Sequence, residues 1–515
     1  MYNYFLKNNI KPNGWLKRQL EIQARGLSGN LDKLWPDIKD SAWIGGTHEG
    51  WERVPYWLDG FIPLSFYLNN KDMIKRSKQF IYAIIKRQNE DGWICPCVKE
   101  KRTTYDMWAL FLIGKVFVEY YEFTNDENVK VSLYKAMKNF YELYNKNEVS
   151  LFEWGKFRWF ECLIPLKFLY DFYKEDWILS LAKKLKENGT NYFDYIQTWK
   201  TPMNKWTFHT HIVNIAMMFK YEVLYCDLLN LKYTNAAEKL WKVLDKYNGS
   251  ANGIFTGDEC LSGKYNNQGT ELCAVVELMY SCELLYSLTK DNVWAERLEK
   301  LAFNALPATI SDDMWTHQYD QMVNQIACIY FPGKPIYRTN GRDANVFGVE
   351  PNYGCCTANF NQGWPKLVDN IYLKTSKGIL CNLMLPSSLN TTIKNSNVSI
   401  NIKTNYPFRH SCKYIINVDK PVNFELKIRI PSWAKKVYLN NEAVKNNGCI
   451  TINKKWSNKE TIEIKLVDQV RFVKRPYNLN CVEYGPLLFS LPINTIYEKH
   501  EYENDGVLYK EPYCN

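Results

Sequence analysis

The sequence predicts a mainly α-helical protein with a β domain at its C-terminal end. From about Trp15 to Leu373 the apolar residues recur every three or four positions, which is the spacing of helices that bury one face. After about Tyr372 they recur every second position, which is the spacing of strands. A chain of 515 residues is also too long for one ordinary core. We therefore expect a helical catalytic domain over residues 1–372 and a β domain over residues 373–515.

Helical segments recur along the first part of the chain, separated by stretches rich in Gly, Asn and Ser such as KENGTN and YNGSANG. Clear examples are LYKAMKNFYELY at Leu133, WILSLAKKLKEN at Trp177, AAEKLWKVLDKY at Ala236 and VWAERLEKLAFNAL at Val293. These segments show no detectable sequence repeat. Paired helices over such a length form either an open α-solenoid or a closed (α/α) toroid, and the periodicity alone does not separate the two.

The C-terminal part alternates apolar and polar residues over short runs. FELKIRIPSW at Phe424, CITINKKW at Cys449 and TIEIKL at Thr461 follow this pattern, and NNEA and KKWSNKE provide turns. Short strands separated by turns predict an antiparallel β-sandwich.

The net charge of +10 comes from 65 basic and 55 acidic residues spread along the chain. The densest basic clusters, Lys99–Arg102 and Lys183–Lys186, are interpreted as solvated helix ends, so no nucleic-acid partner is expected. The N-terminus lacks the apolar core of a signal peptide, and no run reaches about 18 uninterrupted apolar residues, so no membrane association is expected. We expect a cytoplasmic protein whose 15 cysteines stay mostly reduced, where paired cysteines indicate metal binding or catalysis before disulfides.

Two cysteine motifs stand out. PNYGCCTANFNQGW, residues 351–364, contains the adjacent pair Cys355 and Cys356, and GTELCA opens a predicted helix at Gly269. Thr270 is a candidate N-cap, which places Glu271 and Cys273 in the first turn, where the helix dipole favours anions and lowers the pKa of a thiol. One carboxylate and three thiolates form a plausible tetrahedral zinc set. The residues alone leave open that the four are unrelated.

Other polar residues are candidates for catalysis or for substrate binding. Glu259 lies in the polar loop GIFTGDECLSG before the Glu271 helix, in the kind of loop that carries catalytic groups, although a surface role is the alternative. His209 and His211 lie at the start of an apolar helix, where residues two apart point to different sides, so we expect one of them to face a pocket. Core or capping roles are the alternative for both histidines.

The segments HEGWERVPYWLDG and HQYDQMVNQ mix aromatic residues with acids and amides, which is typical of sites that recognise hydroxyl groups. Their candidate substrate-binding residues are Glu52, Tyr319 and Gln321.

Six segments together resemble glycoside hydrolase family 127, the β-L-arabinofuranosidase type, over nearly the whole chain. They are WERVPYWLDGFIPL at Trp51, HIVNIAM at His211, GTELCA at Gly269, NYGCCTANF at Asn352, IPSWAKKVYLNNEAV at Ile430 and VEYGPLLFSL at Val482. The resemblance implies an (α/α)6 barrel followed by an antiparallel β-sandwich.

The resemblance also implies a zinc ion, Zn2+, held by Glu271, Cys273, Cys355 and Cys356. Within this set Cys355 would be the nucleophile, with Glu259 as the acid/base. His211 would be a pocket histidine. Two departures put the identity of the substrate in doubt: the loop between Glu259 and Glu271 is shorter than in the family, and Arg158 lies near the position of a second pocket histidine.

The activity implied is that of a retaining glycoside hydrolase, exo-acting on a β-L-arabinofuranoside or a similar sugar. The expected partner is a small oligosaccharide or glycoside, and a homodimer is the candidate assembly. Two alternatives come from other classes of protein. A helical-toroid sugar epimerase or isomerase would use bases such as His209 and His211, and a non-catalytic glycan-binding protein would hold a structural zinc ion.

Overall fold

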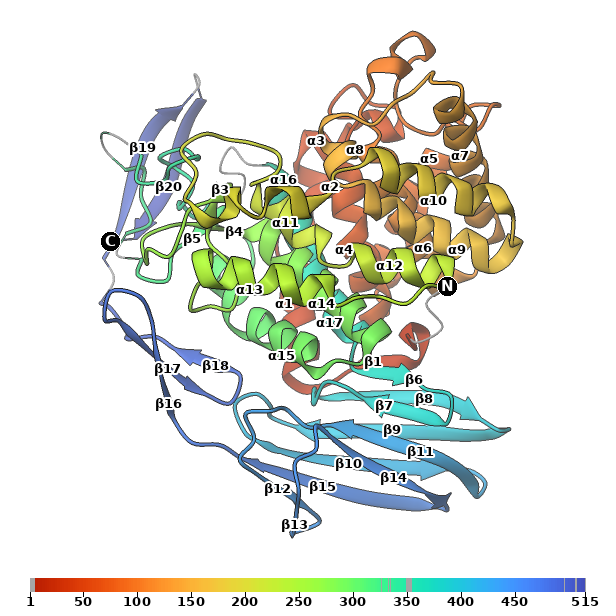
Figure 1. Cartoon of the computed structure of the whole chain (residues 1–515), viewed down its shortest axis with the longest axis vertical. Helices are drawn as coiled ribbons and strands as arrows, with labels where there is room; N and C mark the ends of the chain where they lie inside the picture. The colour runs from red at the N-terminus through yellow and green to blue at the C-terminus, as the bar shows by residue number, and fades with distance from the viewer. Residues whose placement is uncertain are drawn as a thin grey trace.

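The computed structural model describes residues 5–325, 327–331, 333, 335–348, 354–494, 496–504 and 507–514. It confirms a helical domain followed by a domain of mostly antiparallel strands, and Figure 1 shows the two lying one above the other. The sandwich strands β6 to β15 form the lower part of that view, and the helices form the upper part.

The inner helices close into a ring, because each packs against the next and the last packs against the first. In order around the ring they are α4 (Arg53–Tyr67), α6 (Trp108–Thr124), α9 (Leu163–Tyr173), α11 (Ile212–Met218) continued by α12 (Tyr221–Leu229), α14 (Leu272–Thr289) and α17 (Gly363–Asp369). The closure decides between the two architectures that periodicity left open: the domain is an (α/α)6 barrel and not an open solenoid.

The outer helices are amphipathic, with one buried and one polar face, whereas the inner helices are buried on nearly all sides. The outer set is α1 (Gly14–Arg25), α5 (Lys71–Lys86), α7 (Glu127–Asn145), α10 (Asp176–Asn188), α13 (Ala236–Asn248) and α15 (Asn292–Lys300). Within the described residues, α14 is long and apolar enough to cross a membrane by length and composition, but 83% of it is buried inside the protein. It is one of the six inner helices of the barrel.

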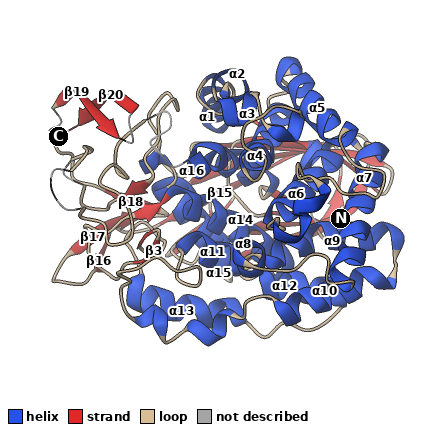
Figure 2. Cartoon of the chain, turned by 90° about the horizontal axis from the view of Figure 1, so that it is seen from above, coloured by secondary structure: helices blue, strands red, loops and turns tan. Residues whose placement is uncertain are grey.

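Short elements lie at one end of the barrel. They are the helices α2 (Leu31–Leu34), α3 (Pro36–Lys39), α8 (Glu153–Phe157) and α16 (Gly354–Asn359), and a small sheet in the order β3-β2-β4-β5. The strands of this sheet are β2 (Gly257–Asp258), β3 (Cys260–Leu261), β4 (Thr270–Glu271) and β5 (Asp320–Gln321). Figure 2 places β3 on the same side as α11 and α16. Strands of two residues leave no periodic signal, so the sequence did not predict this sheet.

The sandwich has two layers. One is a seven-stranded sheet in the order β1-β8-β9-β10-β15-β12-β13, and the other is a four-stranded sheet in the order β14-β11-β7-β6. Their bounds are β1 (Ile10–Pro12), β6 (Tyr372–Lys374), β7 (Gly378–Cys381), β8 (Ser387–Ile393), β9 (Ser396–Thr404), β10 (Ser411–Val418), β11 (Val422–Arg429), β12 (Lys436–Leu439), β13 (Glu442–Val444), β14 (Cys449–Trp456) and β15 (Lys459–Val467).

Two features of the sandwich differ from the simple antiparallel pattern. β7 and β11 pair in parallel, while the other described pairs in the two layers are antiparallel. β1 comes from the N-terminus and pairs with β8, so the first residues of the chain belong to the sandwich sheet. The chain continues into a three-stranded sheet and a hairpin, β16 (Arg471–Lys474), β17 (Asn480–Tyr484), β18 (Leu487–Phe489), β19 (Tyr497–Asn504) and β20 (Val507–Cys514).

Candidate active site and metal centre

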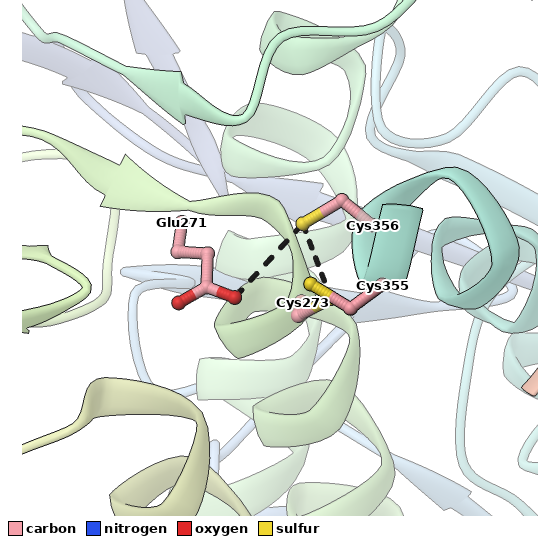
Figure 3. A group of neighbouring side chains, drawn as sticks. All are labelled: Glu271, Cys273, Cys355 and Cys356. Atoms are coloured by element: carbon pink, nitrogen blue, oxygen red, sulfur yellow. Dashed lines mark hydrogen bonds between the residues drawn. The ribbon is translucent and has the colours of Figure 1, made fainter. Parts of the chain in front are cut away.

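The four predicted metal ligands come from the N-terminal ends of two helices. Glu271 directly precedes α14, and Cys273 lies in the first turn of that helix. Cys355 and Cys356 lie in the first turn of α16. The one oxygen and three sulfur atoms that these residues offer all lie within 4.8 Å of one another. Figure 3 shows the side chains converging from the two helices.

Helix α14 begins one residue later than predicted. Glu271 and not Thr270 is its N-cap residue, and the Glu271 side chain does not cap the helix. Its carboxyl group faces the cysteines instead (Figure 3). Asn352 and Tyr353, which open the NYGCCTANF motif, lie outside the described residues.

The four residues could hold a metal ion. Sγ of Cys356 lies 3.1 Å from Sγ of Cys273 and 4.0 Å from Oε1 of Glu271. Ligands that lie about 2.0–2.3 Å from a zinc ion are about 3.3–3.8 Å from one another in a tetrahedron. Oε2 of Glu271 is buried and has no hydrogen-bond partner among the described residues. Burying such an oxygen is costly, and a cation among these four residues would offset that cost.

The electrostatics concentrate negative charge on Cys355. Hydrogen bonds from the Cys273 and Cys356 thiols, helped by the positive charge of Arg53, hold the pKa of Cys355 well below its usual value. Burial raises the pKa of Cys273 and of Cys356 well above theirs. Cys355 also lines the pocket described below and is the least buried member of the cluster. Among the three thiols it is therefore the one that is both least buried and most readily ionised.

Glu259 lies between β2 and β3 in a backbone conformation that few residues other than glycine adopt. Its φ is +75°, and such a conformation costs about 1–3 kcal/mol. The backbone around it is held in place, because its carbonyl accepts a hydrogen bond from the N–H of Ile212 at 2.7 Å. Strain that the surrounding structure maintains is typical of functional positions.

Tyr319 connects Glu259 to Cys355. Its hydroxyl donates a hydrogen bond to Oε1 of Glu259 at 3.0 Å and lies 3.8 Å from Sγ of Cys355. Burial and the negative charge of Cys355 raise the pKa of Glu259 to about 7, although Tyr319 and Trp206 act to lower it. A carboxyl group with a pKa near neutrality can both give and take a proton.

These residues line one pocket with a volume of about 310 Å³. Its walls combine the candidate nucleophile and acid with aromatic, cationic and histidine side chains: Trp51, Glu52, Arg53, Tyr56, Trp154, Arg158, Trp206, His211, Val213, Glu259, Glu271, Cys273, Tyr319 and Cys355. Of the predicted substrate-binding residues, Glu52, His211 and Tyr319 are among them.

His211 is a neutral imidazole in this pocket, because burial and the charge of Arg158 lower its pKa to about 3. Its Nδ1 has no hydrogen-bond partner among the described residues, and its Nε2 lies 3.7 Å from Oε2 of Glu271. The neutral ring can therefore donate a hydrogen bond to a bound hydroxyl group or accept one from it.

Two predicted substrate-binding residues do not line the pocket. The His209 ring stacks on Tyr195, with centroids 4.4 Å apart. Gln321 is buried and is engaged at both ends of its amide, accepting from Asn252 at 3.0 Å and donating to the Ala305 carbonyl at 2.8 Å. Only His211 of the histidine pair faces the pocket.

Two arginines complete the pocket. Arg158 lies between the rings of Trp108 and Trp154, at 4.6 and 4.3 Å, and its Nε donates to Asn214 at 2.7 Å. Sequence reasoning did not single out Arg53, whose charge lowers the pKa of Cys355.

Gly354, next to the cysteine pair, is the sequence feature that could have pointed to Arg53. A Cβ atom at Gly354 would lie only 2.9 Å from Nε of Arg53, so the glycine next to the cysteine pair lets the guanidinium group approach.

Comparisons with known proteins agree with this geometry. A family model described as the β-L-arabinofuranosidase GH127 catalytic domain matches residues 8–369, and one for the GH127 middle domain matches residues 378–467. No curated protein matches the chain.

Among solved structures, the chain is similar to Ara127N, a GH127 β-L-arabinofuranosidase from Geobacillus stearothermophilus T6, with 16% identity and a TM-score of 0.70 over 98% of this chain and 96% of that one. It is also similar to another GH127 β-arabinofuranosidase, with 14% identity and a TM-score of 0.75 over 100% of this chain and 95% of that one. At these identities the structures support the fold.

The match of the catalytic-domain model covers most of the chain and includes all four cluster residues. Membership of a hydrolase family favours hydrolysis over the epimerase and the glycan-binding alternatives. The chain therefore belongs to glycoside hydrolase family 127, the β-L-arabinofuranosidase family, and is a glycoside hydrolase.

Proposed function

We propose that the protein is a retaining, exo-acting hydrolase of β-L-arabinofuranosides or similar sugars, with Cys355 as the nucleophile and Glu259 as the acid/base. The observation that carries this proposal is the position of Tyr319. Its hydroxyl lies 3.0 Å from the Glu259 carboxyl and 3.8 Å from the Cys355 sulfur. The two reacting groups are thus at most about 7 Å apart, a separation compatible with direct nucleophilic attack.

In the first step Sγ of Cys355 attacks the anomeric carbon as the bond to the leaving oxygen breaks, and Glu259 gives its proton to that oxygen. The product is a sugar joined to Cys355 through a carbon–sulfur bond. In the second step the Glu259 carboxylate takes a proton from a water molecule, whose oxygen attacks the same carbon and displaces the sulfur. Two displacements at one carbon give retention of configuration.

Glu271, Cys273, Cys355 and Cys356 would hold a zinc ion, which when bound supplies positive charge that keeps the thiols deprotonated. The other groups of the pocket have roles that follow from their positions. Neutral His211 can hydrogen-bond a sugar hydroxyl, and Glu52 and Tyr319 face the same cavity.

The test combines metal analysis of the purified protein with a panel of nitrophenyl furanosides and pyranosides. Cys355→Ala is expected to remain folded and to lose hydrolysis, because alanine offers no nucleophile. Glu259→Gln is expected to lose activity chiefly on substrates with poor leaving groups, which need the proton. Hydrolysis at the wild-type rate by the Cys355 variant would remove the nucleophile assignment.

A further inference from the structure

A second polar contact joins the two helices of the cysteine cluster, one turn further along each. Glu277 follows Cys273 by four residues on α14, and Asn359 follows Cys355 by four residues on α16. Because an α-helix has 3.6 residues per turn, each lies below its cysteine on the same face. Nδ2 of Asn359 donates to Oε1 of Glu277 at 3.1 Å. Nε2 of Gln362, in the short helix η9 (Phe360–Gln362) after α16, donates to the same oxygen at 3.0 Å.

This contact is fully enclosed and charged. Glu277, Asn359 and Gln362 are each 0% exposed. Burial acts to raise the pKa of Glu277, but the charges of Lys115, Lys220 and Lys366 outweigh it and leave the pKa below its usual value. The carboxylate is therefore ionised, and hydrogen bonds to an ionised acceptor are about twice as strong as neutral ones.

The geometry of α16 explains why such a contact matters. The helix has six residues, and a helix of that length is held in place by its packing and not by its own stability. A rotation of α16 by one residue, about 100°, would turn its cysteines away from α14. The contact at Glu277 opposes such a rotation, because Asn359 and Gln362 both reach the same carboxylate oxygen.

We propose that Glu277 is a positioning residue, which fixes the rotation of α16 against α14 so that Cys355 and Cys356 face Glu271 and Cys273. This inference rests on the proposed role of the cluster as a metal site. Glu277 does not touch the substrate pocket, so its contribution is to the geometry of the ligands.

The test measures Co2+ binding to the purified metal-free protein through the thiolate-to-cobalt absorption band, with chelator competition to give Kd. Glu277→Gln keeps the shape of the side chain and one acceptor oxygen but removes the negative charge, so the hydrogen bonds from Asn359 and Gln362 are no longer made to an ionised acceptor. We expect Co2+ affinity to fall by about 10- to 100-fold, as for groups that orient metal ligands.

The same helix offers a matched control. Glu283 is also buried on α14, and burial raises its pKa well above its usual value. In the described part of the chain it accepts no hydrogen bond from α16 or η9. Glu283→Gln is therefore expected to keep the wild-type Co2+ affinity.

A rescue variant covers the case in which Glu277→Gln fails to fold. The double variant Glu277→Gln with Gln362→Glu moves the carboxylate across the contact, which preserves the charge of the core, and the Asn359 amide can turn over to donate to the new carboxylate; this variant is expected to restore the affinity. Wild-type Kd in Glu277→Gln, an equal loss in Glu283→Gln, or a folded double variant that stays weak would each overturn the inference. Failure of the wild-type protein to bind Co2+ would instead remove the proposed metal site, and the inference with it.

Discussion

Replacing Tyr319 by phenylalanine should raise the pH at which activity is lost on the alkaline side. The Tyr319 hydroxyl donates to Glu259 at 3.0 Å and stabilises the charged form of that carboxyl. A hydrogen bond to a charged group contributes about 1.5 kcal/mol, which corresponds to about one pKa unit. Without the hydroxyl, the pKa of Glu259 should rise from about 7 to about 8.

The direction of this shift in the pH profile follows from the proposed role of Glu259. The first step needs its protonated form, so kcat/KM falls as the pH rises through its pKa, and a higher pKa moves that fall to higher pH. The assay is the pH profile of kcat/KM on an aryl glycoside for the wild-type protein and for Tyr319→Phe. A matched control is Tyr414→Phe, because the Tyr414 hydroxyl is buried in the sandwich without a hydrogen-bond partner among the described residues. An alkaline limb that stays in place or moves down in Tyr319→Phe would refute the reasoning.

Three further changes test the site. Gly354→Ala places a Cβ 2.8 Å from the Trp35 ring and 2.9 Å from Arg53. It should destabilise the protein by about 1–3 kcal/mol, seen as a lower Tm together with reduced kcat/KM; an unchanged Tm would contradict the tight packing. Trp206 contacts Glu259, the proposed acid, and is 37% exposed, so it lies on the side of the pocket where the leaving group must sit. Trp206→Ala should therefore reduce kcat/KM on a disaccharide by about tenfold and spare a methyl glycoside. An equal loss on both substrates would argue against that placement. Removing metal with a chelator should lower Tm, and zinc at about 1,000 times its Kd should restore about 4 kcal/mol of stability; a Tm that does not respond to zinc would contradict a metal site at the cluster.

The sequence predicted the features that have a long-range signal. Helical periodicity located α7, α10, α13 and α15, and alternation located β11, β14 and β15. The closure of the barrel depends on contacts between helices far apart in the chain, and no local pattern contains that information. The small sheet that carries Glu259 is built from two-residue strands, too short for any periodicity.

The candidate site was predictable in composition and less so in orientation. Glu271, Cys273, Cys355 and Cys356 come together as expected. His209 and Gln321 belong to the right segments, but their side chains face other partners, because the direction of a side chain in an irregular segment is set by tertiary contacts. The roles of the site residues, the domain boundary, the homodimer and the cytoplasmic location stay predictions.

The N-terminal strand β1 has a practical consequence for shortened versions of the protein. Three residues near the start of the chain, Ile10–Pro12, are hydrogen-bonded to β8, and the bridge between Phe5 and Leu373 extends the connection. A truncation that keeps only the barrel would leave these backbone groups unpaired and uncover an edge prone to aggregation. Soluble expression of the barrel is therefore expected to require both β1 and β8 in the same polypeptide.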